Sequence, residues 1–443
     1  MSSNQLDVLV IGAGFAGLSA ALALKQNGLK TCILEARERV GGRVKTRYTS
    51  DGTQIPLGGQ WIGPTQDYMY ELVEKYQIEV FATKTEGKDI VKYNGHIVDK
   101  APKEIDDLYD KLDKLAETVN LEQPWLTPDA KVLDGETFAS WLQRESATPQ
   151  AASFVARVLA GGLLATDAAE CSVLQMLFYI KSGHGITSLT GVQGGAQQDR
   201  VMGGLEYIAD KMAEDFGEEN ILFSHPVRRI IYHDDHVEVV TDRDRYFAKR
   251  AILAIPLAVM NQIEFTPQLP ILKHKVLSHT LAPGAFKVHL VFQKPFWNDF
   301  GLSGNSTFGS GYIFEAYNNT VVDNGTGVLS FFSYGNEADE LRAKTIEERK
   351  AIFLGELEPI FGKGIHDYLE YIEYDWSEQL YTRGCFSSHF SPNGWYTLGE
   401  EFNKNVGPLY WAGAEFAIHW NGYADGAVRS GKEVAHQVFR SIK

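Results

Sequence analysis

Two spacings of apolar residues divide this chain into segments. The runs Asp7–Ile11 and Lys30–Leu34 are almost continuously apolar, which is typical of buried parallel strands, and the residues between them predict a helix. From about Pro102 to Ser182 the spacing becomes that of amphipathic helices. The two clearest stripes are Ile105, Leu108, Leu112 and Leu115, and Val173, Leu174, Met176, Leu177 and Ile180. We expect both stripes to lie in a hydrophobic core.

Strand patterns return in the second half of the chain. They cover Val237–Val240, Ala251–Ile255, Lys287–Phe292, where polar and apolar residues alternate, and the run Leu409–Glu415. A helix is predicted from about Ile346 to Phe361, and a last helix from Gly426 through Val438. No proline- or serine-rich linker separates these segments. The pattern therefore predicts an α/β fold in which two domains are interleaved.

A glycine-rich turn follows the first predicted strand, with the sequence Gly12-Ala13-Gly14-Phe15-Ala16-Gly17. In this spacing Gly12 permits a tight turn, Gly14 lets a pyrophosphate approach the backbone, and Gly17 lets the helix pack closely on the strand. The N-terminus of the helix stabilises phosphate charge. The second strand ends on Glu35, which suits the hydroxyl groups of a ribose. Strand, glycines, helix and acid in this order predict a dinucleotide site.

A second glycine motif, Arg39-Val40-Gly41-Gly42-Arg43, lies just beyond the acid. It resembles the motif of two-dinucleotide-binding-domain flavoproteins, and the resemblance implies that the dinucleotide is FAD. The segment Leu57–Gly63 is also rich in glycine and contains Gly58, Gln60 and Trp61. Its spacing suits a backbone packed close to a flat ligand.

The composition argues against several classes of function. A formal net charge of -15 and a pI of 5.3 do not fit nucleic-acid binding, which needs a clustered basic surface. Cys32, Cys171 and Cys385 are widely separated, so neither a disulfide framework nor a metal site is expected. No apolar run approaches the roughly twenty residues of a membrane span. We therefore expect a cytoplasmic protein without a membrane anchor.

The C-terminal segments Ala412–Glu415 and His419–Ala427 resemble the flavin-containing monoamine oxidase family. Further motifs carry the resemblance over nearly the whole chain: Gly58–Trp61, Gly194–Asp199, the Lys287 strand with Pro295-Phe296-Trp297, and Trp376–Cys385. The resemblance implies a two-dinucleotide-binding-domain flavoprotein, with a Rossmann-like FAD domain and an interleaved α+β substrate domain. The FAD domain would take residues 1–80, 200–283 and 391–443, and the substrate domain residues 81–199 and 284–390.

The resemblance assigns three residues to catalysis. Lys287 matches the family lysine that holds a water beside flavin N5, where a fixed cation can support reoxidation by oxygen or orient that water. Tyr423 matches one wall of the aromatic pair that flanks the substrate amine. The opposite wall falls on Phe386, where the mammalian enzymes have tyrosine.

The remaining matches concern the cofactor. Glu415 resembles the acid near the ribityl and pyrophosphate groups, and Val227 resembles the residue whose backbone contacts adenine. The last helix, near Ala427, would direct its positive end toward the flavin O2 region. Cys385 occupies the position where some members attach the flavin through a thioether, although Arg383 stands where covalent members have glycine. The resemblance therefore implies FAD, either free or covalently bound through Cys385.

The function that the resemblance implies is oxidation of an amine to an imine, which hydrolyses to a carbonyl compound, while O2 is reduced to H2O2. Two alternative enzymes use the same scaffold: an L-amino-acid oxidase, for which Arg383 is the arginine nearest the aromatic pair in sequence, and a flavin desaturase. A flavoprotein without enzymatic activity is a third alternative, against which the retained Lys287 and Tyr423 argue.

The identity of the amine is left open between aryl-alkyl, aliphatic, diamine and cyclic compounds, as is a homodimeric state. The partners implied are a small-molecule amine and O2. We expect the substrate cavity to be lined by Leu174, Leu177, Phe178 and Ile180 and by residues His184–Thr190.

Overall fold

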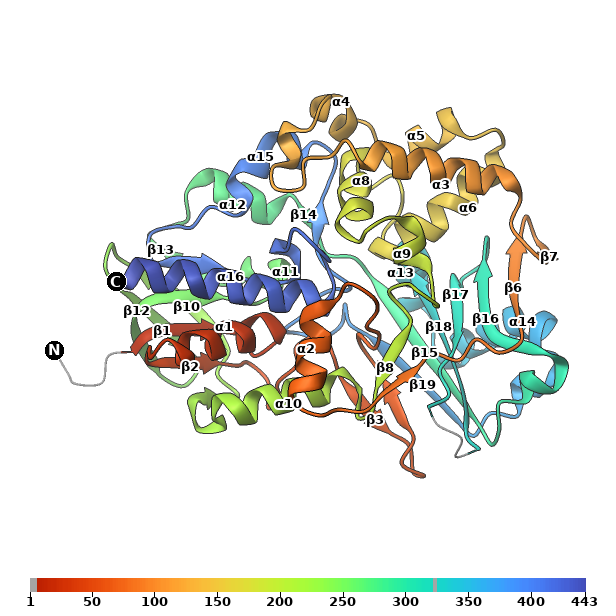
Figure 1. The fold of residues 1–443 in the computed structure, drawn as a ribbon, viewed down its shortest axis with the longest axis horizontal. Helices are drawn as coiled ribbons and strands as arrows, with labels where there is room; N and C mark the ends of the chain where they lie inside the picture. Colours follow the sequence, from red (N-terminus) through yellow and green to blue (C-terminus); the bar gives the residue numbers. More distant parts are fainter. Residues whose placement is uncertain (1–5, 322–324) are drawn as a thin grey trace.

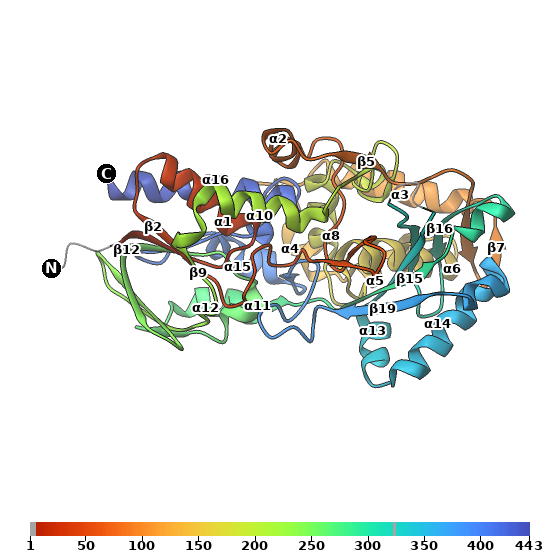
Figure 2. The same cartoon turned by 90° about the horizontal axis from the view of Figure 1, so that it is seen from below.

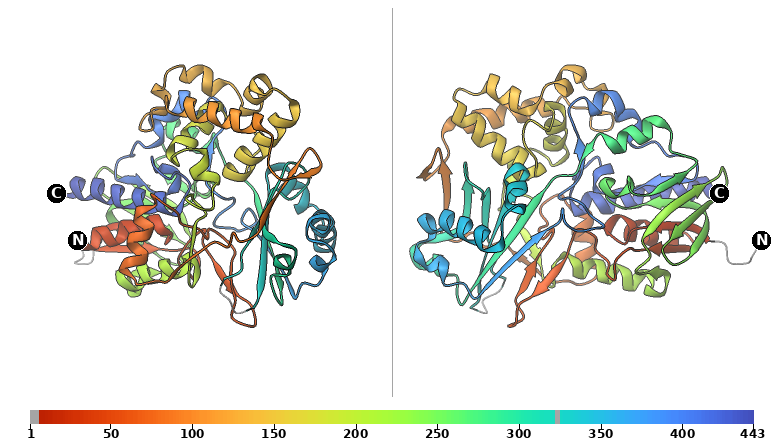
Figure 3. Two further views of the ribbon diagram at one scale, coloured as in Figure 1. Left: turned by 45° about the vertical axis from the view of Figure 1, so that its right-hand side comes forward. Right: turned by 180° about the vertical axis from the view of Figure 1, so that it is seen from behind.

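The computed structural model describes residues 6–321 and 325–443. Two large β-sheets lie side by side, and a layer of helices lies above them in Figure 1. The first strand and the C-terminal end of the last helix lie at the same end of the molecule, far from the second sheet (Figures 1 and 3).

The first sheet contains eight strands, in the order β13-β10-β11-β12-β1-β2-β9 with β21 beside β12. Parallel pairing joins β21, β12, β1, β2 and β9, whereas β10 and β11 extend the sheet by antiparallel pairing. The strands are β1 (Leu6–Ile11), β2 (Thr31–Leu34), β9 (Ile221–Leu222), β10 (Val227–Tyr232), β11 (Val237–Thr241), β12 (Arg245–Leu253), β13 (Glu264–Thr266) and β21 (Leu409–Trp411). Segments from the beginning, middle and end of the chain therefore share one sheet.

Helices cover both faces of the first sheet (Figure 2). On one face α1 (Phe15–Gln26) packs against α10 (Gly204–Phe216) and α16 (Ala424–Ile442), and α2 (Asp67–Lys75) packs against α16. On the other face lie α11 (Leu257–Met260) and α12 (Ile271–Ser278), with α15 (Gly394–Phe402) packed against α12. The helices α1 and α16 approach closely because Gly431 has no side chain: a Cβ there would lie 2.2 Å from the carbonyl oxygen of Ala16.

The second sheet contains seven strands in the order β19-β15-β18-β17-β16-β6-β7. They are β6 (Lys88–Tyr93), β7 (His96–Val98), β15 (Ala285–Phe292), β16 (Leu302–Phe308), β17 (Glu315–Asn318), β18 (Gly327–Tyr334) and β19 (Glu370–Asp375). On the lower side of this sheet in Figure 2 lie α13 (Gly335–Arg342) and α14 (Ile346–Phe361), the latter with the predicted bounds.

The alternation predicted for Lys287–Phe292 is confirmed, but both faces of this strand are buried. Phe286, Val288 and Leu290 pack in a core with side chains of α13 and α14. Lys287 and His289 point to the opposite face and are also buried. A strand that is buried on both faces therefore carries two titratable side chains into the interior.

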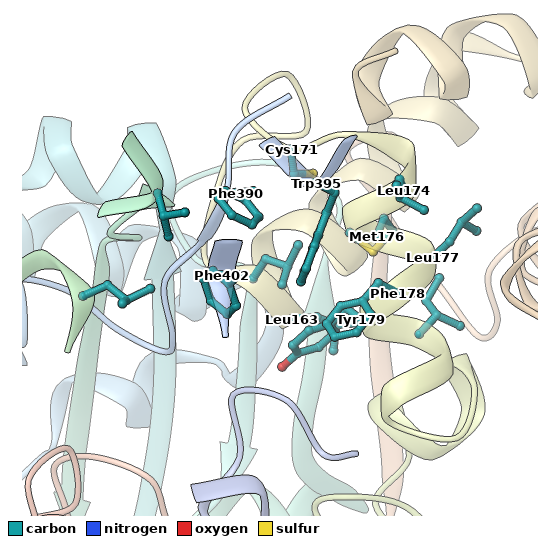
Figure 4. Packing of buried hydrophobic residues seen from close by; sticks show 14 of the residues in the cluster. Leu163, Cys171, Leu174, Met176, Leu177, Phe178, Tyr179, Phe390, Trp395 and Phe402 are labelled. Atoms are coloured by element: carbon teal, nitrogen blue, oxygen red, sulfur yellow. The ribbon is translucent and has the colours of Figure 1, made fainter. Parts of the chain in front are cut away.

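The helical layer is formed by α3 (Lys103–Ala116), α4 (Ala130–Gly135), α5 (Phe138–Glu145), α6 (Pro149–Ala156), α7 (Gly162–Leu164), α8 (Val173–Ser182) and α9 (Ile186–Thr190). Both predicted stripes lie in its core, except that Leu115 is only half-buried. Figure 4 shows α8 packed against Phe390, Trp395 and Phe402 from the C-terminal part of the chain.

Three short strand pairs complete the fold: β3 (Thr46–Tyr48) with β4 (Gln54–Pro56), β5 (Val80–Ala82) with β8 (Asp199–Val201), and β14 (Thr280–Leu281) with β20 (His389–Phe390).

Candidate active site

One cavity extends from the end of β1 to the helical layer and brings nearly all the predicted site residues together. Its lining includes Gly12, Gly14, Glu35, Gly42, Arg43, Gly58, Gln60, Trp61, Val227, Lys287, Cys385, Phe386, Glu415, Tyr423 and Ala427. Gly17 lies outside the lining, under the turn. A Cβ on Gly17 would lie 1.9 Å from the carbonyl oxygen of Gly12, so Gly17 serves the close packing of α1 on the turn.

The glycine turn leaves backbone exposed at one end of the cavity. Gly12 has φ +103°, and a Cβ there would lie 2.5 Å from the carbonyl oxygen of Ala254. Around Gly14 the nearest atom to a Cβ would be the Cα of Gly42, at 3.9 Å, so the space beside this residue is open. The N-terminus of α1 begins directly after Gly14. Open space beside a helix N-terminus is suited to a phosphate group.

Glu35 follows β2 and is buried at the same end of the cavity. Its carboxylate accepts hydrogen bonds from the backbone N–H groups of Ala13 and Arg37, both at 2.8 Å. Burial raises the pKa of Glu35, and these two hydrogen bonds offset only part of the shift.

Arg43 and Glu415 form a two-point ion pair between the second glycine motif and the turn after β21. The distances are 2.6 Å from Arg43 Nη1 to Glu415 Oε1 and 3.0 Å from Nη2 to Oε2. Arg43 Nη1 also donates to the carbonyl oxygen of Phe386 at 2.6 Å. The pair therefore connects the end of the cavity at the glycine turn to the loop that carries Cys385 and Phe386.

The last helix, α16, begins at Ala424, two residues before the predicted start at Gly426, and continues to Ile442. Tyr423 is its N-cap and has an extended backbone. The Asp425 carboxylate, in the first turn of α16, caps α2 by accepting hydrogen bonds from the N–H groups of Tyr68 and Met69. Because Ala424 and Ala427 line the cavity, the positive end of α16 lies at its wall.

Lys287 reaches the cavity from the middle of β15. Its Nζ donates to the carbonyl oxygen of Gly58 at 2.9 Å and to Oε1 of Gln60. Burial and the nearby Arg200 guanidinium hold the pKa of Lys287 well below its usual range.

Phe386 and Tyr423, to which the resemblance assigns the aromatic pair, both line the cavity. The Phe386 ring contacts the edge of the Tyr334 ring, with centroids 5.6 Å apart. The Tyr423 ring lies 6.3 Å from the ring of Tyr179, whose hydroxyl hydrogen-bonds to that of Tyr423. Figure 4 shows Tyr179 at the lower edge of the α8 cluster with its hydroxyl directed away from the helix.

Cys385 is a buried free thiol in the cavity lining. Burial raises its pKa to about 12, and Asp375 acts in the same direction, while Arg43 and Lys287 oppose it. The thiol is therefore uncharged in the ligand-free protein.

The predicted lining by Leu174, Leu177, Phe178 and Ile180 is wrong. These side chains pack in the core of the helical layer because α8 is buried on all sides. Tyr179 is the α8 residue that lines the cavity, and Leu189 and Thr190 supply the expected contribution of the following segment.

Sequence reasoning missed a group of polar and aromatic residues at the far end of the cavity: Arg157, Thr307, Glu315, Tyr317, Phe332 and Tyr334. Glu315 begins β17, and its two oxygens accept hydrogen bonds from the hydroxyls of Tyr334 (2.5 Å) and Tyr317 (3.0 Å). The alternation Glu315-Ala316-Tyr317 was the available signal, since it places the two polar side chains on one face of a strand.

Arg383 is exposed and does not line the cavity, so the hypothesis that it faces a substrate carboxylate is wrong. Arg157 does line the cavity, but its guanidinium already donates to Glu337 and to the carbonyl oxygens of Phe308 and Ile313. Among residues 6–321 and 325–443, no group of three or more His, Cys, Asp or Glu side chains is arranged to hold a metal ion.

The sequence profile described as flavin containing amine oxidoreductase matches residues 15–439. The chain belongs to this family. Putrescine oxidase from Kocuria rosea is 32% identical over 456 residues, covering 98% of this chain and 95% of that protein. An L-amino acid dehydrogenase from Synechocystis is 29% identical over 458 residues, covering 98% and 95%.

Solved structures of the family have the same fold as this amine oxidase. Wild-type putrescine oxidase bound to putrescine superposes with a TM-score of 0.95 at 32% identity, covering 99% of both chains. Cyclohexylamine oxidase from Brevibacterium oxydans superposes with a TM-score of 0.95 at 28% identity, covering 99% of this chain and 100% of that one. The α/β two-dinucleotide-binding-domain fold predicted from the sequence is thereby confirmed.

This amine oxidase uses FAD to oxidise an amine to an imine and passes the electrons to O2, which yields H2O2. The cavity fits that cofactor on its own geometry. It combines the open space beside Gly14 with the N-terminus of α1. It also contains the Trp61 indole N–H, a buried donor that has no partner among the described residues. In the described part of the chain no helix is long and apolar enough to cross a membrane.

Proposed function

We propose that this amine oxidase acts on a primary amine that carries a second ammonium group, as in a short aliphatic diamine. The observation that carries the proposal is Glu315, a carboxylate inside the cavity. No Lys or Arg of the described residues is close enough to neutralise it. Burial raises the pKa of Glu315, and the hydroxyls of Tyr334 and Tyr317 offset this only in part. A substrate ammonium beside Glu315 would supply the missing opposite charge.

The position of Glu315 relative to the aromatic residues supports a substrate with two ends. Tyr334 contacts the ring of Phe386 on one side and donates its hydroxyl to Glu315 on the other. The Glu315 carboxylate is therefore separated from Phe386, which flanks the proposed reacting amine, by about the length of the Tyr334 side chain. Putrescine, the ligand in the similar structure named above, is a diamine with four carbons.

In this proposal Tyr423 and Phe386 flank the amine that reacts, and they hold its α-carbon in front of the flavin. Rings on both sides orient the amine and exclude water. Lys287 holds a water beside the reactive face. Bound FAD supplies the acceptor for the hydride equivalent of the α-carbon and the site of O2 reduction. The protein contributes the orientation and the electrostatic environment.

We further propose the cofactor roles implied by the glycine motifs. Gly12, Gly14 and Gly42 give the pyrophosphate access to the backbone, Glu35 binds the adenosine ribose, and Val227 contacts the adenine. Arg43 and Glu415 lie at the middle of the cofactor. Residues 1–80, 200–283 and 391–443 form the FAD domain, and residues 81–199 and 284–390 the substrate domain. The predominance of first-sheet strands in the first set supports this division.

Covalent attachment through Cys385 is part of the same proposal. Its thiol would form a thioether with the flavin C8α methyl carbon, losing two hydrogens whose electrons pass through the flavin to O2. Attachment needs proton loss from the thiol, which the nearby Arg43 guanidinium favours. Cys32, Cys171 and Cys385 are all free, which supports a cytoplasmic, reducing location.

A peroxide-coupled assay across an amine panel tests the proposal. The panel contains diamines of three to six carbons, benzylamine, cyclohexylamine and an L-amino acid. We expect one of the short diamines to have the highest kcat/KM. A higher kcat/KM for benzylamine, cyclohexylamine or the amino acid than for every diamine would overturn the assignment.

A further inference from the structure

Behind Lys287 lies a buried polar network that the cofactor and substrate roles leave unexplained. Gln60, which accepts a hydrogen bond from Lys287, forms a reciprocal amide pair with Asn319. The distances are 3.1 Å from Gln60 Nε2 to Asn319 Oδ1 and 3.3 Å from Asn319 Nδ2 to Gln60 Oε1. Asn319 Nδ2 also donates to Ser330 Oγ at 2.7 Å, and His289 Nδ1 lies 2.6 Å from the same oxygen. Gln60 is thus held by Asn319, which is in turn hydrogen-bonded to Ser330 of β18, and Ser330 contacts His289 of β15.

Arg200 is the permanent charge of this network. It is 1% exposed, and its Nη1 donates to the carbonyl oxygens of Asn319 (2.9 Å) and Thr320 (3.4 Å). Nη2 has no partner among the described residues, and no carboxylate of those residues contributes to its electrostatic environment. A guanidinium keeps its proton under physiological conditions. Arg200 therefore places a positive charge close to Lys287, and no carboxylate of the described residues forms an ion pair with it.

Among residues 6–321 and 325–443, no carboxylate partner faces Lys287. Arg200 faces it from β8, the Cys385 thiol from the loop before Phe386, and His289 from its own strand. Asp375, Arg43 and Arg342 act on that thiol rather than on the amine. Two buried cations side by side without an acid are costly, and of the two only the lysine loses its proton readily.

The hydrogen bonds of Lys287 match an uncharged amine. A neutral amine has two N–H groups and one lone pair, whereas an ammonium has three N–H groups. The structure provides two acceptors, the carbonyl oxygen of Gly58 and Oε1 of Gln60. When both N–H groups of a neutral Lys287 donate to these two acceptors, the lone pair of Nζ is left to face the cavity.

We propose that Gln60, Asn319 and Arg200 are positioning residues that hold Lys287 as an uncharged amine with its lone pair directed into the cavity. In that state Lys287 accepts a hydrogen bond from the water beside the flavin and can receive a proton at Nζ. The inference rests on the proposed place of Lys287 at the flavin face. It does not depend on which amine is the substrate.

The test is a direct titration of Lys287 in the FAD-loaded protein labelled with [ε-13C]lysine. Lys287→Met identifies the signal. We expect its midpoint at least about 2 units below the ordinary lysine value of about 10.4. Gln60→Glu changes one atom and places a carboxylate against Nζ, so the midpoint should rise by about 1 to 3 units. Arg200→Met should raise it by about 1 unit.

Lys273→Met is the matched control. Lys273 is another buried cation, which donates to the carbonyl oxygens of Glu401 and Phe402 far from the network, so its loss should leave the Lys287 midpoint unchanged. The pH dependence of flavin reoxidation should shift with the midpoint in each variant. A merely structural network would change stability or FAD content without moving either.

Two results would overturn the proposal: a wild-type midpoint near 10.4, the ordinary value, or a low midpoint that Gln60→Glu leaves unchanged. If Arg200→Met does not fold, Gln60→Glu decides alone because it preserves the side-chain volume. If no amine in the panel released peroxide, the proposed function would be rejected. The Lys287 titration would still test the present proposal, because it does not depend on turnover of an amine.

Discussion

The cofactor end of the cavity is built mostly from backbone in consecutive motifs, whereas the substrate end is built from single side chains of distant elements. At the cofactor end, Gly12, Gly14 and Gly17 lie within one turn, and each acts by lacking a side chain. At the substrate end, Glu315, Phe386 and Tyr423 come from β17, a loop and the N-cap of α16. A short motif can therefore specify the cofactor end, but only the complete fold assembles the substrate end.

The largest effect should come from Gly14→Val, which tests the cofactor end alone. A Cβ at Gly14 would have the Cα of Gly42, 3.9 Å away, as its nearest atom outside the neighbouring residues, so we expect the apoprotein to fold normally. The valine side chain would keep the pyrophosphate away from the backbone N–H groups. Because each hydrogen bond to a charged group contributes roughly 1.5–3 kcal/mol, the FAD affinity should fall about 100-fold. The FAD content and Kd of the purified variant measure this.

Gly17→Val is the contrasting control, because its Cβ would collide with the carbonyl oxygen of Gly12. It should lower the melting temperature of the apoprotein itself. If both variants lost stability equally, the distinction between a ligand-contacting and a packing glycine would be refuted.

Cys385→Ala tests whether the flavin is covalently attached to the protein through the Cys385 thiol. We expect acid-precipitated wild-type protein to stay yellow and to exceed the chain mass by one FAD, whereas the variant releases its flavin. Cys171→Ala, which changes a buried cysteine outside the cavity, should behave as the wild type. Flavin found entirely in the wild-type supernatant would show that the cofactor is bound without a covalent link.

Tyr423→Ala addresses the substrate end. Loss of one orienting wall should reduce kcat/KM by roughly 10- to 100-fold while FAD content stays normal. Tyr423→Phe keeps the ring and loses only the hydrogen bond from Tyr179, so its effect should be smaller. Unchanged kcat/KM in the alanine variant would place the reacting amine elsewhere.

The smallest effect is a pH-dependent stability change from Glu315, whose pKa is raised in the folded protein. Between the unfolded pKa, about 4.3, and the raised folded pKa, the folded state binds more protons, so stability falls as pH rises through this window. Glu315→Gln removes that loss. At neutral pH the substrate-free variant should therefore be more stable than wild type by roughly 1 kcal/mol, which raises the melting temperature of a chain of this length by about 1 °C. At pH 4 the two proteins should melt at the same temperature. A lower melting temperature at neutral pH would contradict this reasoning.

The residues predicted for the cofactor end lie almost all in the lining of one cavity, and their contacts with FAD stay a prediction. The glycine spacing, Glu35 and the second glycine motif are contiguous signals, and every predicted cofactor residue except Gly17 lines the cavity. The predicted start of α16 at Gly426 is two residues late. The Asp425 carboxylate in its first turn caps α2, a helix more than 350 positions away in the chain. Local signals do not reveal which helix a capping residue serves.

The substrate end could not be predicted in the same way. Leu174, Leu177 and Phe178 were expected at the cavity because α8 is apolar, yet an apolar helix buried on all sides gives no sign of which residue faces a cavity. Glu315 was missed because a single acid in a strand is usually exposed. Its burial depends on the packing of Tyr317 and Tyr334 around it.

The central claim is that the substrate end of the cavity selects amines with a second ammonium group. The most direct test compares two substrates on two proteins. The substrates are 1,4-diaminobutane and butylamine, which differ only in the far amino group, and the proteins are wild type and Glu315→Gln. We predict that wild type prefers the diamine by about 100-fold in kcat/KM, roughly 2.7 kcal/mol. Glu315→Gln should lose this preference without losing activity on butylamine. A preference of the same size in both proteins, or none in wild type, would contradict the account.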